Sequence, residues 1–148
     1  MFYGTFSPKL DDKGRMFLPA KFREAMSAGC VATLGFDRAV AIYPHDAFER
    51  LNAQVSALPM TVQANREFAR MFRANAHSQV PDKQGRIVLP AHLRAYARLD
   101  KELVVNGSGE FLEVWNAADW YGYSEAKQDV YSAMNAELMS GGVPLGLG

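Results

Sequence analysis

The chain has little of what marks secreted and membrane-spanning proteins. Its 148 residues include one cysteine, Cys30, which rules out an internal disulfide framework and fits a reducing cytoplasm. No stretch approaches the roughly 20 apolar residues of a membrane-spanning helix. The opening MFYGTFSPKL lacks the basic and apolar regions of a signal peptide. We therefore expect a soluble protein that is not exported and has no membrane partner.

Signals of catalysis and of cofactor binding are also sparse. The phosphate-binding pattern G-x-x-x-x-G-K-[ST] and the dinucleotide pattern G-x-G-x-x-G do not occur. The histidines His45, His77 and His92 follow no metal-ligand spacing. Cys30 follows a helix-ending glycine in an apolar stretch, which favours a core position over a nucleophile. We therefore predict a protein that is not an enzyme, with no cofactor, no metal site and no small-molecule substrate.

Net charge is absent as well, with 16 basic residues against 16 acidic ones. The balance hides an asymmetry: residues 1–98 hold 14 Lys and Arg against 8 Asp and Glu, a balance of +6, while residues 99–148 hold 2 against 8, a balance of −6. Such a protein can bind a polyanion on its basic side. The acidic segment either faces away or meets a basic neighbour, or it is only a solvated face, and these alternatives stay open.

What the sequence does contain is a repeat. The block DDKGRMFLPAKFR at 11–23 returns as DKQGRIVLPAHLR at 82–94, with seven identical positions at an offset of 71 residues. This offset is too long for a solenoid unit and indicates a duplicated small domain. Two domains of about 45 residues each would be marginal alone, so we expect them to share one core and to gain burial by oligomerising.

Each copy of the block predicts a turn, a strand and a short helix. Gly14 and Gly85 stand where a turn needs a positive φ, and the arginine that follows each glycine then begins a strand. The expected elements are buried strands at 16–18 and 87–89 and proline-started helices at 20–28 and 91–98. The flanking segments predict strands at 2–10, 31–35, 39–43, 76–80, 102–106 and 111–115, with a further helix over about 61–75. Another helix opens at Asp46, where Glu49 completes a capping box.

The doubled D-x-x-x-R followed by a strand and Leu-Pro, with the start Met1-Phe2-Tyr3-Gly4, resembles the MraZ family of tandem SpoVT-AbrB-type domains. The resemblance runs to about residue 140. It implies an α+β fold in which two AbrB-like βαββ repeats of the swapped-hairpin type form one pseudo-two-fold double-split β-barrel with flanking helices. The residues alone support a duplicated, mixed α/β unit with a shared core. The expected divisions are domain 1 at 1–53, a helical linker at 54–75, domain 2 at 76–120, and a C-terminal helix and tail at 121–148.

The resemblance also implies a function. It implies a cytoplasmic, nucleoid-associated bacterial transcriptional regulator, acting as a repressor, that binds short direct repeats at the promoter of the cell-division and cell-wall gene cluster. The expected partners are double-stranded DNA and further copies of the chain in a ring-shaped homo-oligomer. Two alternatives stay open: an antitoxin-like protein-interaction module, and a structural ring that does not bind DNA.

The candidate DNA-binding residues lie in or beside the two turns. Arg15 and Arg86 each offer a planar, always charged fork that can pair with a guanine edge or with phosphate oxygens. Each can also pair with the aspartate four residues earlier, which would orient it toward DNA. Nearby lysines suit sequence-independent phosphate contacts. The full set is Lys9, Asp11, Lys13, Gly14, Arg15, Asp82, Lys83, Gly85 and Arg86.

Several basic residues keep more than one interpretation. The two turns differ, since Asp12 corresponds to Lys83 and Lys13 to Gln84, so they need not contribute equally. The arginines of the short helices are either DNA-facing or structural; they are Arg23 and Arg94. A row on the helix over 61–75 either contacts phosphates or an acidic neighbour or is a solvated face; it comprises Arg66, Arg70 and Arg73. The glycine-rich end at 141–148 has no readable function.

Overall fold

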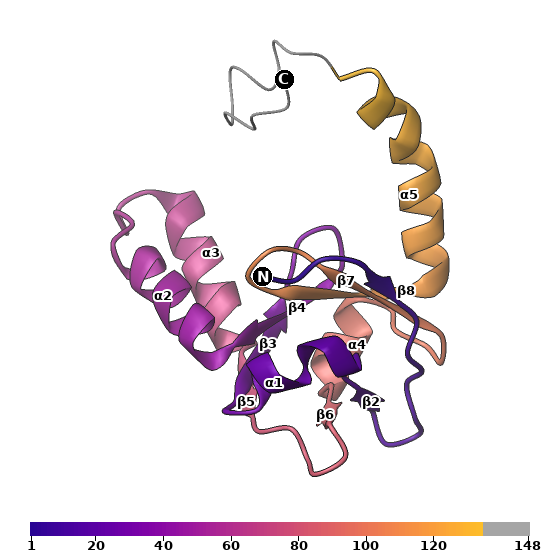
Figure 1. Ribbon diagram of the computed structural model, residues 1–148. Coiled ribbons are helices and arrows are strands. Elements are labelled where there is room, and N and C mark those ends of the chain that lie inside the picture. Colours follow the sequence, from indigo (N-terminus) through magenta and orange to yellow (C-terminus); the bar gives the residue numbers. More distant parts are fainter. Residues whose placement is uncertain (135–148) are drawn as a thin grey trace. The chain divides into compact units, whose positions relative to one another are not determined.

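The computed structural model describes residues 1–134 (Figure 1), and the chain divides into two units, the second of which begins at Ala118. The glycine-rich end at 141–148, and with it part of the expected segment 121–148, lies outside the described residues. Within residues 1–134, no helix combines the length and the apolar character that crossing a membrane requires. The first unit contains both copies of the repeat.

The described residues form short strands and helices in an α+β arrangement. The strands are β1 (Thr5–Phe6), β2 (Arg15–Phe17), β3 (Cys30–Leu34), β4 (Val40–Pro44), β5 (His77–Gln79), β6 (Arg86–Val88), β7 (Leu103–Gly107) and β8 (Leu112–Asn116). The helices are a 3-10 turn (Ala20–Phe22), α1 (Arg23–Met26), α2 (His45–Ser56), α3 (Gln63–Ala74), α4 (Ala91–Tyr96) and α5 (Ala117–Ser132). Helix α5 leads into the second unit, where Trp120 stacks on Tyr123 with ring centroids 5.9 Å apart.

Six strands form one antiparallel sheet in the order β1-β7-β8-β4-β3-β5. Exchanging the corresponding strands of the two repeats, β1 with β5, β3 with β7 and β4 with β8, gives the same order read from the other edge. The sheet is therefore symmetric about its central pair, β4 and β8, in which Ala41 lies opposite Glu113. The first strand of each repeat pairs with the other repeat, β1 with β7 and β5 with β3. The two repeats are therefore interleaved and fold as one unit.

The remaining two strands, β2 and β6, form a separate antiparallel ribbon. Met16 pairs with Ile87 at its centre, and these positions are 71 residues apart, the offset of the sequence repeat. A pseudo-two-fold axis consequently passes through this central pair. The ribbon carries the two D-x-x-x-R turns, one in front of each strand.

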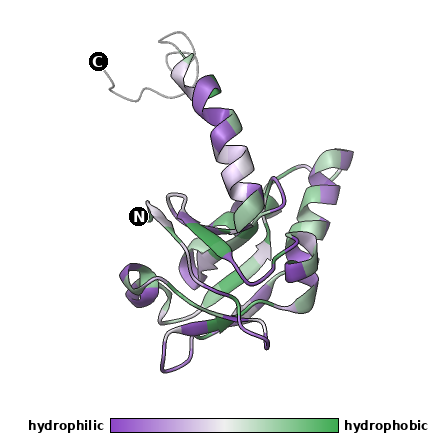
Figure 2. Ribbon diagram, turned by 90° about the vertical axis from the view of Figure 1, so that its right-hand side faces the viewer, coloured by the Kyte–Doolittle hydropathy of each residue, from purple (hydrophilic) through white to green (hydrophobic). Residues whose placement is uncertain are grey.

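The core is shared by both repeats, as predicted. Figure 2 shows mostly hydrophobic strands and largely hydrophilic connecting loops. The fully buried side chains include Met16, Leu18, Phe22 and Ile42 from the first repeat and Ile87, Leu89, Leu93 and Leu112 from the second. Each such apolar side chain contributes about 1.5–3 kcal/mol on burial. Cys30 is buried in the same cluster, which confirms its predicted core position.

Three expectations need correction. The runs 16–18 and 87–89 are not wholly buried, because side chains alternate along a strand and leave Phe17 and Val88 47% and 41% exposed. The predicted first strand 2–10 is reduced to Thr5–Phe6 and two isolated bridges. Helix α2 follows Pro44 without a side-chain cap, so the predicted capping box is wrong. The six-stranded sheet does not close, and β1 and β5 are its edges among the described residues.

Helices α2 and α3 pack on the sheet beside β3 and β4 through aromatic rings (Figure 1). Phe72 of α3 stacks on Phe48 of α2, with centroids 5.2 Å apart. The Thr33 hydroxyl donates to the Phe72 carbonyl at 2.8 Å in a buried position. This hydrogen bond ties the predicted linker helix to the sheet.

Candidate nucleic-acid interface

An aspartate organises the turn in front of each ribbon strand. The Asp11 carbonyl accepts a hydrogen bond from the Gly14 N–H at 3.0 Å. Oδ1 of Asp11 accepts the backbone N–H groups of Lys13 and Arg15 at 2.9 and 2.8 Å. The corresponding bonds around Asp82 are all 2.9 Å. Aspartates that bond their own backbone in this way stabilise turns locally, which explains why both copies share one conformation.

The second carboxylate oxygen of each aspartate holds the following arginine. Oδ2 of Asp11 accepts Nε of Arg15 at 2.8 Å, and Oδ2 of Asp82 accepts Nε of Arg86 at 2.8 Å. No hydrogen bond within residues 1–134 uses the Nη groups of either arginine. The arginine side chains are 31% and 24% exposed. Each guanidinium is therefore oriented by its carboxylate and still presents donors to solvent.

The same bonds lower the pKa of both aspartates. The backbone N–H of Arg15 is the main cause that lowers the pKa of Asp11 below its ordinary 3.8; the guanidinium adds to this effect and desolvation opposes it. The backbone N–H and then the guanidinium of Arg86 lower the pKa of Asp82 in the same way. Both carboxylates are consequently ionised at neutral pH and keep the charge that orients the arginines.

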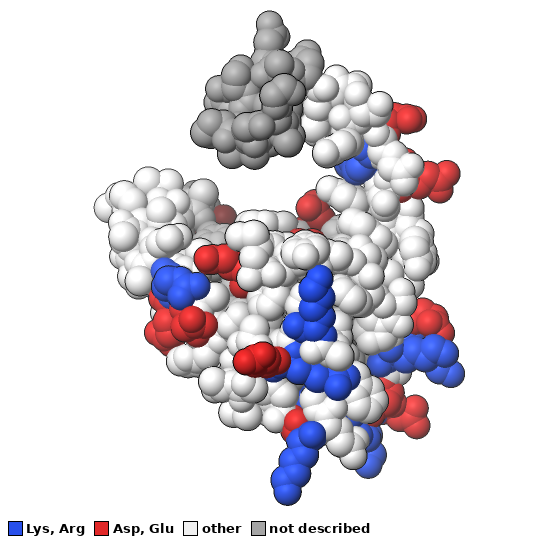
Figure 3. Space-filling model, viewed as in Figure 1, with Lys and Arg blue, Asp and Glu red and all other residues white. Residues whose placement is uncertain are grey.

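The ribbon register brings the two arginines to one surface. Arg15 lies opposite Val88, and Arg86 lies opposite Phe17. Because side chains alternate, these four residues share the outer face of the ribbon. Arg15 and Arg86 are diagonal neighbours, for which Cβ atoms lie about 7–8 Å apart. The turns lie at the lower end of the unit in Figure 1, and Figure 3 shows Lys and Arg over the same region.

The turn glycines have two reasons to be glycine. Gly14 and Gly85 have φ of 77° and 79°, as predicted. A Cβ on Gly85 would lie 2.7 Å from Cδ and Nε of Arg23, and a Cβ on Gly14 would lie 3.0 Å from Nε of Arg94. Arg23 belongs to the first repeat and Arg94 to the second. Each helix arginine thus fills the space over the glycine of the other repeat.

Hydrogen bonds fix these helix arginines. Nε of Arg23 donates to the Leu18 carbonyl at 2.9 Å, and the Leu18 N–H donates to the Gly85 carbonyl at 2.9 Å. The symmetry-related bonds in the other copy are 2.9 and 2.7 Å. Arg23 and Arg94 therefore have a structural role, holding each turn against the opposite repeat.

The predicted lysines do not form one set. Lys13 and Lys83 are exposed at the tips of the turns. Lys9 lies at an isolated bridge, where its Nζ is 3.7 Å from Oε1 of Glu102. The second turn is the more basic one, because Lys83 occupies the position of Asp12 in the first turn. The two turns therefore share one backbone conformation but differ in charge.

Two of the three arginines on α3 have structural partners. Arg66 donates to the Met60 and Thr61 carbonyls at 3.0 and 3.2 Å, which closes the loop before the helix. Arg73 donates to Oδ1 of Asn52 at 2.7 Å and so ties α3 to α2. Arg70 is exposed. The row is therefore a mixture of structural bonds and solvated charge.

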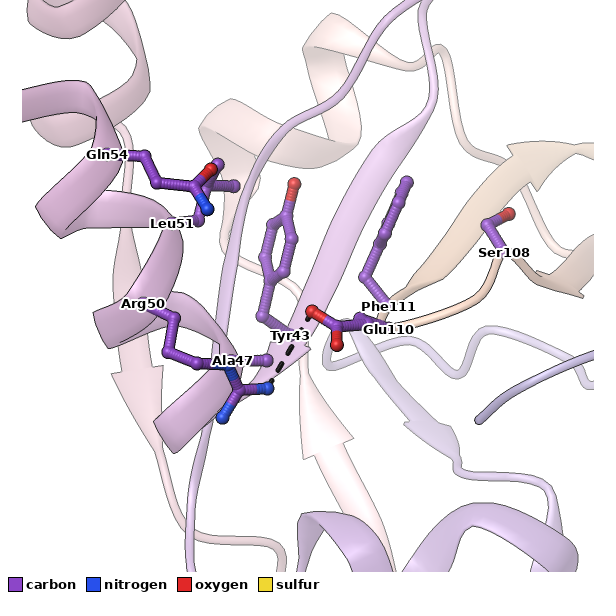
Figure 4. A pocket seen from close by; sticks show the side chains of 8 residues that line it. All are labelled: Tyr43, Ala47, Arg50, Leu51, Gln54, Ser108, Glu110 and Phe111. Atoms are coloured by element: carbon purple, nitrogen blue, oxygen red, sulfur yellow. Dashed lines mark ion pairs between the residues drawn. The ribbon is translucent and has the colours of Figure 1, made fainter. Parts of the chain in front are cut away.

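A pocket of about 490 Å³ lies outside the predicted site, between α2 and the turn that joins β7 to β8 (Figure 4). Tyr43 and Phe111 stack in it with centroids 5.0 Å apart, and Arg50 Nη2 lies 3.7 Å from Glu110 Oε2. Burial, together with the charge of Glu113, raises the pKa of Tyr43. No sequence motif indicated this pocket. Across residues 1–134, no group of three His, Cys, Asp or Glu residues could hold a metal ion.

The outer face of the ribbon also holds a residue that the sequence interpretation missed. Phe17 was expected in a buried run, yet it lies on the exposed face, opposite Arg86 and two residues after Arg15. The signal was present, since a strand that begins at an exposed arginine exposes every second residue after it.

Known proteins resemble the whole described chain. The sequence model of the family described as "MraZ protein, putative antitoxin-like" matches residues 1–71 and again 71–140. The "Transcriptional regulator MraZ" of Thermobifida fusca is 43% identical over 95% of this chain and 99% of its own length. The proteins of the same name from Salinispora arenicola and Cutibacterium acnes are 44% and 46% identical, over 95% and 90% of this chain and 99% and 94% of their own lengths.

Proposed function

This chain belongs to the MraZ family, and we propose that it is a cytoplasmic, non-enzymatic transcriptional regulator that binds double-stranded DNA through the outer face of its β2–β6 ribbon. The names of the relatives support transcriptional regulation. The observation that carries the DNA-binding proposal is the pair of aspartate-oriented arginines, Arg15 and Arg86, on one exposed face. Their Nη groups suit guanine edges and phosphate oxygens.

The remaining parts of the proposed site support the two arginines. Asp11 and Asp82 orient the guanidinium groups, and Gly14 and Gly85 allow the turns. Three exposed lysines supply sequence-independent contacts to phosphates; they are Lys9, Lys13 and Lys83. We expect Lys9 to contribute least to phosphate binding, because its Nζ already lies near the carboxylate of Glu102.

We propose that the chain acts as a ring-shaped homo-oligomer on direct repeats in promoter DNA and represses transcription by occupying them. One ribbon offers few base-contacting side chains, so several ribbons on tandem sites would gain affinity by raising the effective concentration of the next one. Exposed apolar side chains on and beside α3 support self-association; they are Phe36, Phe68 and Met71, which are 71%, 36% and 52% exposed. The exchanged strands β1 and β5 support the view that sheet and ribbon are two parts of a double-split barrel of the swapped-hairpin type.

The test replaces both arginines. Arg15→Ala with Arg86→Ala is expected to abolish binding to a duplex that the wild-type chain selects from a random pool, with unchanged oligomer size by sedimentation. Arg50→Ala with Arg70→Ala removes the same charge from α2 and α3 and should leave binding within about twofold. Retained binding by the first variant would refute the assignment.

Two further measurements define what the arginines contact. Arg15→Lys with Arg86→Lys keeps the charge but loses the fork, so it should keep non-specific binding and lose sequence preference. Each phosphate contact contributes about 0.9 to the slope of log affinity against log salt. If both arginines contact phosphates, their loss lowers that slope by about 1.8. If they contact bases instead, their loss lowers the sequence preference and changes the salt slope little.

The antitoxin-like interaction module is the competing function, and the description of the family as "putative antitoxin-like" is the observation that favours it. A pull-down with the wild-type chain that captures one dominant protein partner, together with no preference for any duplex, would support it. An assembled ring with neither DNA nor a protein partner would support the purely structural alternative.

A further inference from the structure

An exposed aromatic side chain shares the outer face of the ribbon with the two arginines. Phe17 is 47% exposed and lies directly opposite Arg86 in the ribbon. Cζ of Arg86 is 5.9 Å from the Phe17 ring centroid, and Cζ of Arg23 is 6.0 Å from it. Two guanidinium groups thus lie near the phenyl ring, at a distance where cation–π attraction operates. Its position is defined although much of its surface faces solvent.

The other repeat presents a smaller group at the equivalent place. Val88 is related to Phe17 by the pseudo-two-fold axis and is 41% exposed. The side-chain amide of Gln79 donates to the Val88 carbonyl at 2.7 Å and accepts the Val88 N–H at 2.8 Å. Pro8 stands at the position 71 residues before Gln79, so the first repeat lacks this clamp. The two equivalent positions of the ribbon therefore carry apolar side chains of different size, Phe17 and Val88.

A phenyl ring cannot bind phosphate, so its place beside two cationic forks calls for an apolar group on the nucleic acid. The major groove admits a two-stranded β-ribbon, and the 5-methyl group of thymine is the apolar feature of its base edges. Resting on the DNA-binding function proposed above, we propose that Phe17 reads a thymine methyl group in the major groove. Val88 reaches less far, so the two repeats of one ribbon prefer different bases.

The expected effect is modest and measurable. Losing contact with one methyl group corresponds to about fourfold in affinity, from the usual contribution of one buried apolar carbon. The probe is a duplex selected from a random pool by the wild-type chain and resynthesised with deoxyuridine in place of each thymine in turn. Deoxyuridine lacks only the methyl group and keeps base pairing. One or more positions should bind wild-type chain about fourfold more weakly.

Phe17→Ala is expected to bind the thymine probe more weakly and to lose the contrast between thymine and deoxyuridine at those positions. Phe17→Leu should keep part of the contrast, because leucine retains an apolar tip. Val88→Ala is the matched control, since it truncates the equivalent exposed residue and should keep the contrast. All variants are compared as full chains at one protein concentration, with oligomer size measured alongside.

The outcomes separate this inference from the function on which it rests. If the wild-type chain selects no duplex, or if loss of Arg15 and Arg86 leaves selection intact, the proposed function fails. If the wild-type chain selects a duplex but no thymine position responds to deoxyuridine, the role of Phe17 is overturned and the function stands. The role of Phe17 is also overturned if Phe17→Ala keeps the full contrast, or if it changes oligomer size, which would make Phe17 a protein contact.

Discussion

Replacing Gly85 by alanine tests whether the helix arginines hold the turns in place. Gly85 has a φ of 79°, and a Cβ there would lie 2.7 Å from both Cδ and Nε of Arg23. The substitution therefore acts twice. It forces a left-handed conformation on a residue with a Cβ, and it displaces the Arg23 side chain from its hydrogen bond to the Leu18 carbonyl.

Gly109 supplies a control in which the first effect acts alone. Its φ is 87°, and a Cβ there would meet nothing within 4 Å. A left-handed alanine costs about 1–2 kcal/mol, and this should be the whole effect of Gly109→Ala. Loss of a hydrogen bond from a charged donor adds about 1.5–3 kcal/mol. Gly85→Ala should therefore lower the free energy of unfolding by about 2.5–5 kcal/mol, the sum of these two ranges.

The assay is urea unfolding followed by circular dichroism, at one protein concentration because self-association would shift the apparent stability. Arg23→Ala completes a double-mutant cycle. In that background no side chain opposes the new methyl group, and Gly85→Ala should cost no more than Gly109→Ala does in the wild type. Equal losses for Gly85→Ala and Gly109→Ala in the wild-type background would refute the packing role of Arg23.

Two further predictions concern titrating groups. The pKa of Asp11 and of Asp82 is lowered in the folded chain from 3.8, so the stability that these carboxylates contribute is complete above that pH and is lost as pH falls through the folded pKa values. The loss of folding stability measured from pH 6 to pH 2 should therefore be less steep for Asp11→Asn with Asp82→Asn than for the wild type. An unchanged profile would contradict this. Burial raises the pKa of the Cys30 thiol to about 11. The folded chain should therefore resist alkylation by iodoacetamide at pH 8 and react only as urea unfolds it, which mass spectrometry can follow. Rapid modification of Cys30 without urea would contradict this prediction.

The sequence alone determined the features that local chemistry encodes. The aspartate, glycine and arginine of each turn specify its conformation through bonds spanning four residues, so the repeat at offset 71 was enough to predict two equal turns, each followed by a strand. The four strands that flank residues 36–38 and 107–110 were also predicted to within about a residue, since each is a short, largely apolar run. The doubled motif likewise identified the family.

Only the tertiary structure decided which face each side chain takes and which repeat it serves. The pairing of β2 with β6 joins positions 71 residues apart, and it places Phe17 on the exposed face opposite Arg86. The roles of Arg23 and Arg94 depend on the glycine of the opposite repeat, a contact that no local pattern records. The physical reason is that turns are stabilised within a few residues, whereas burial and strand register depend on which distant segments pack together.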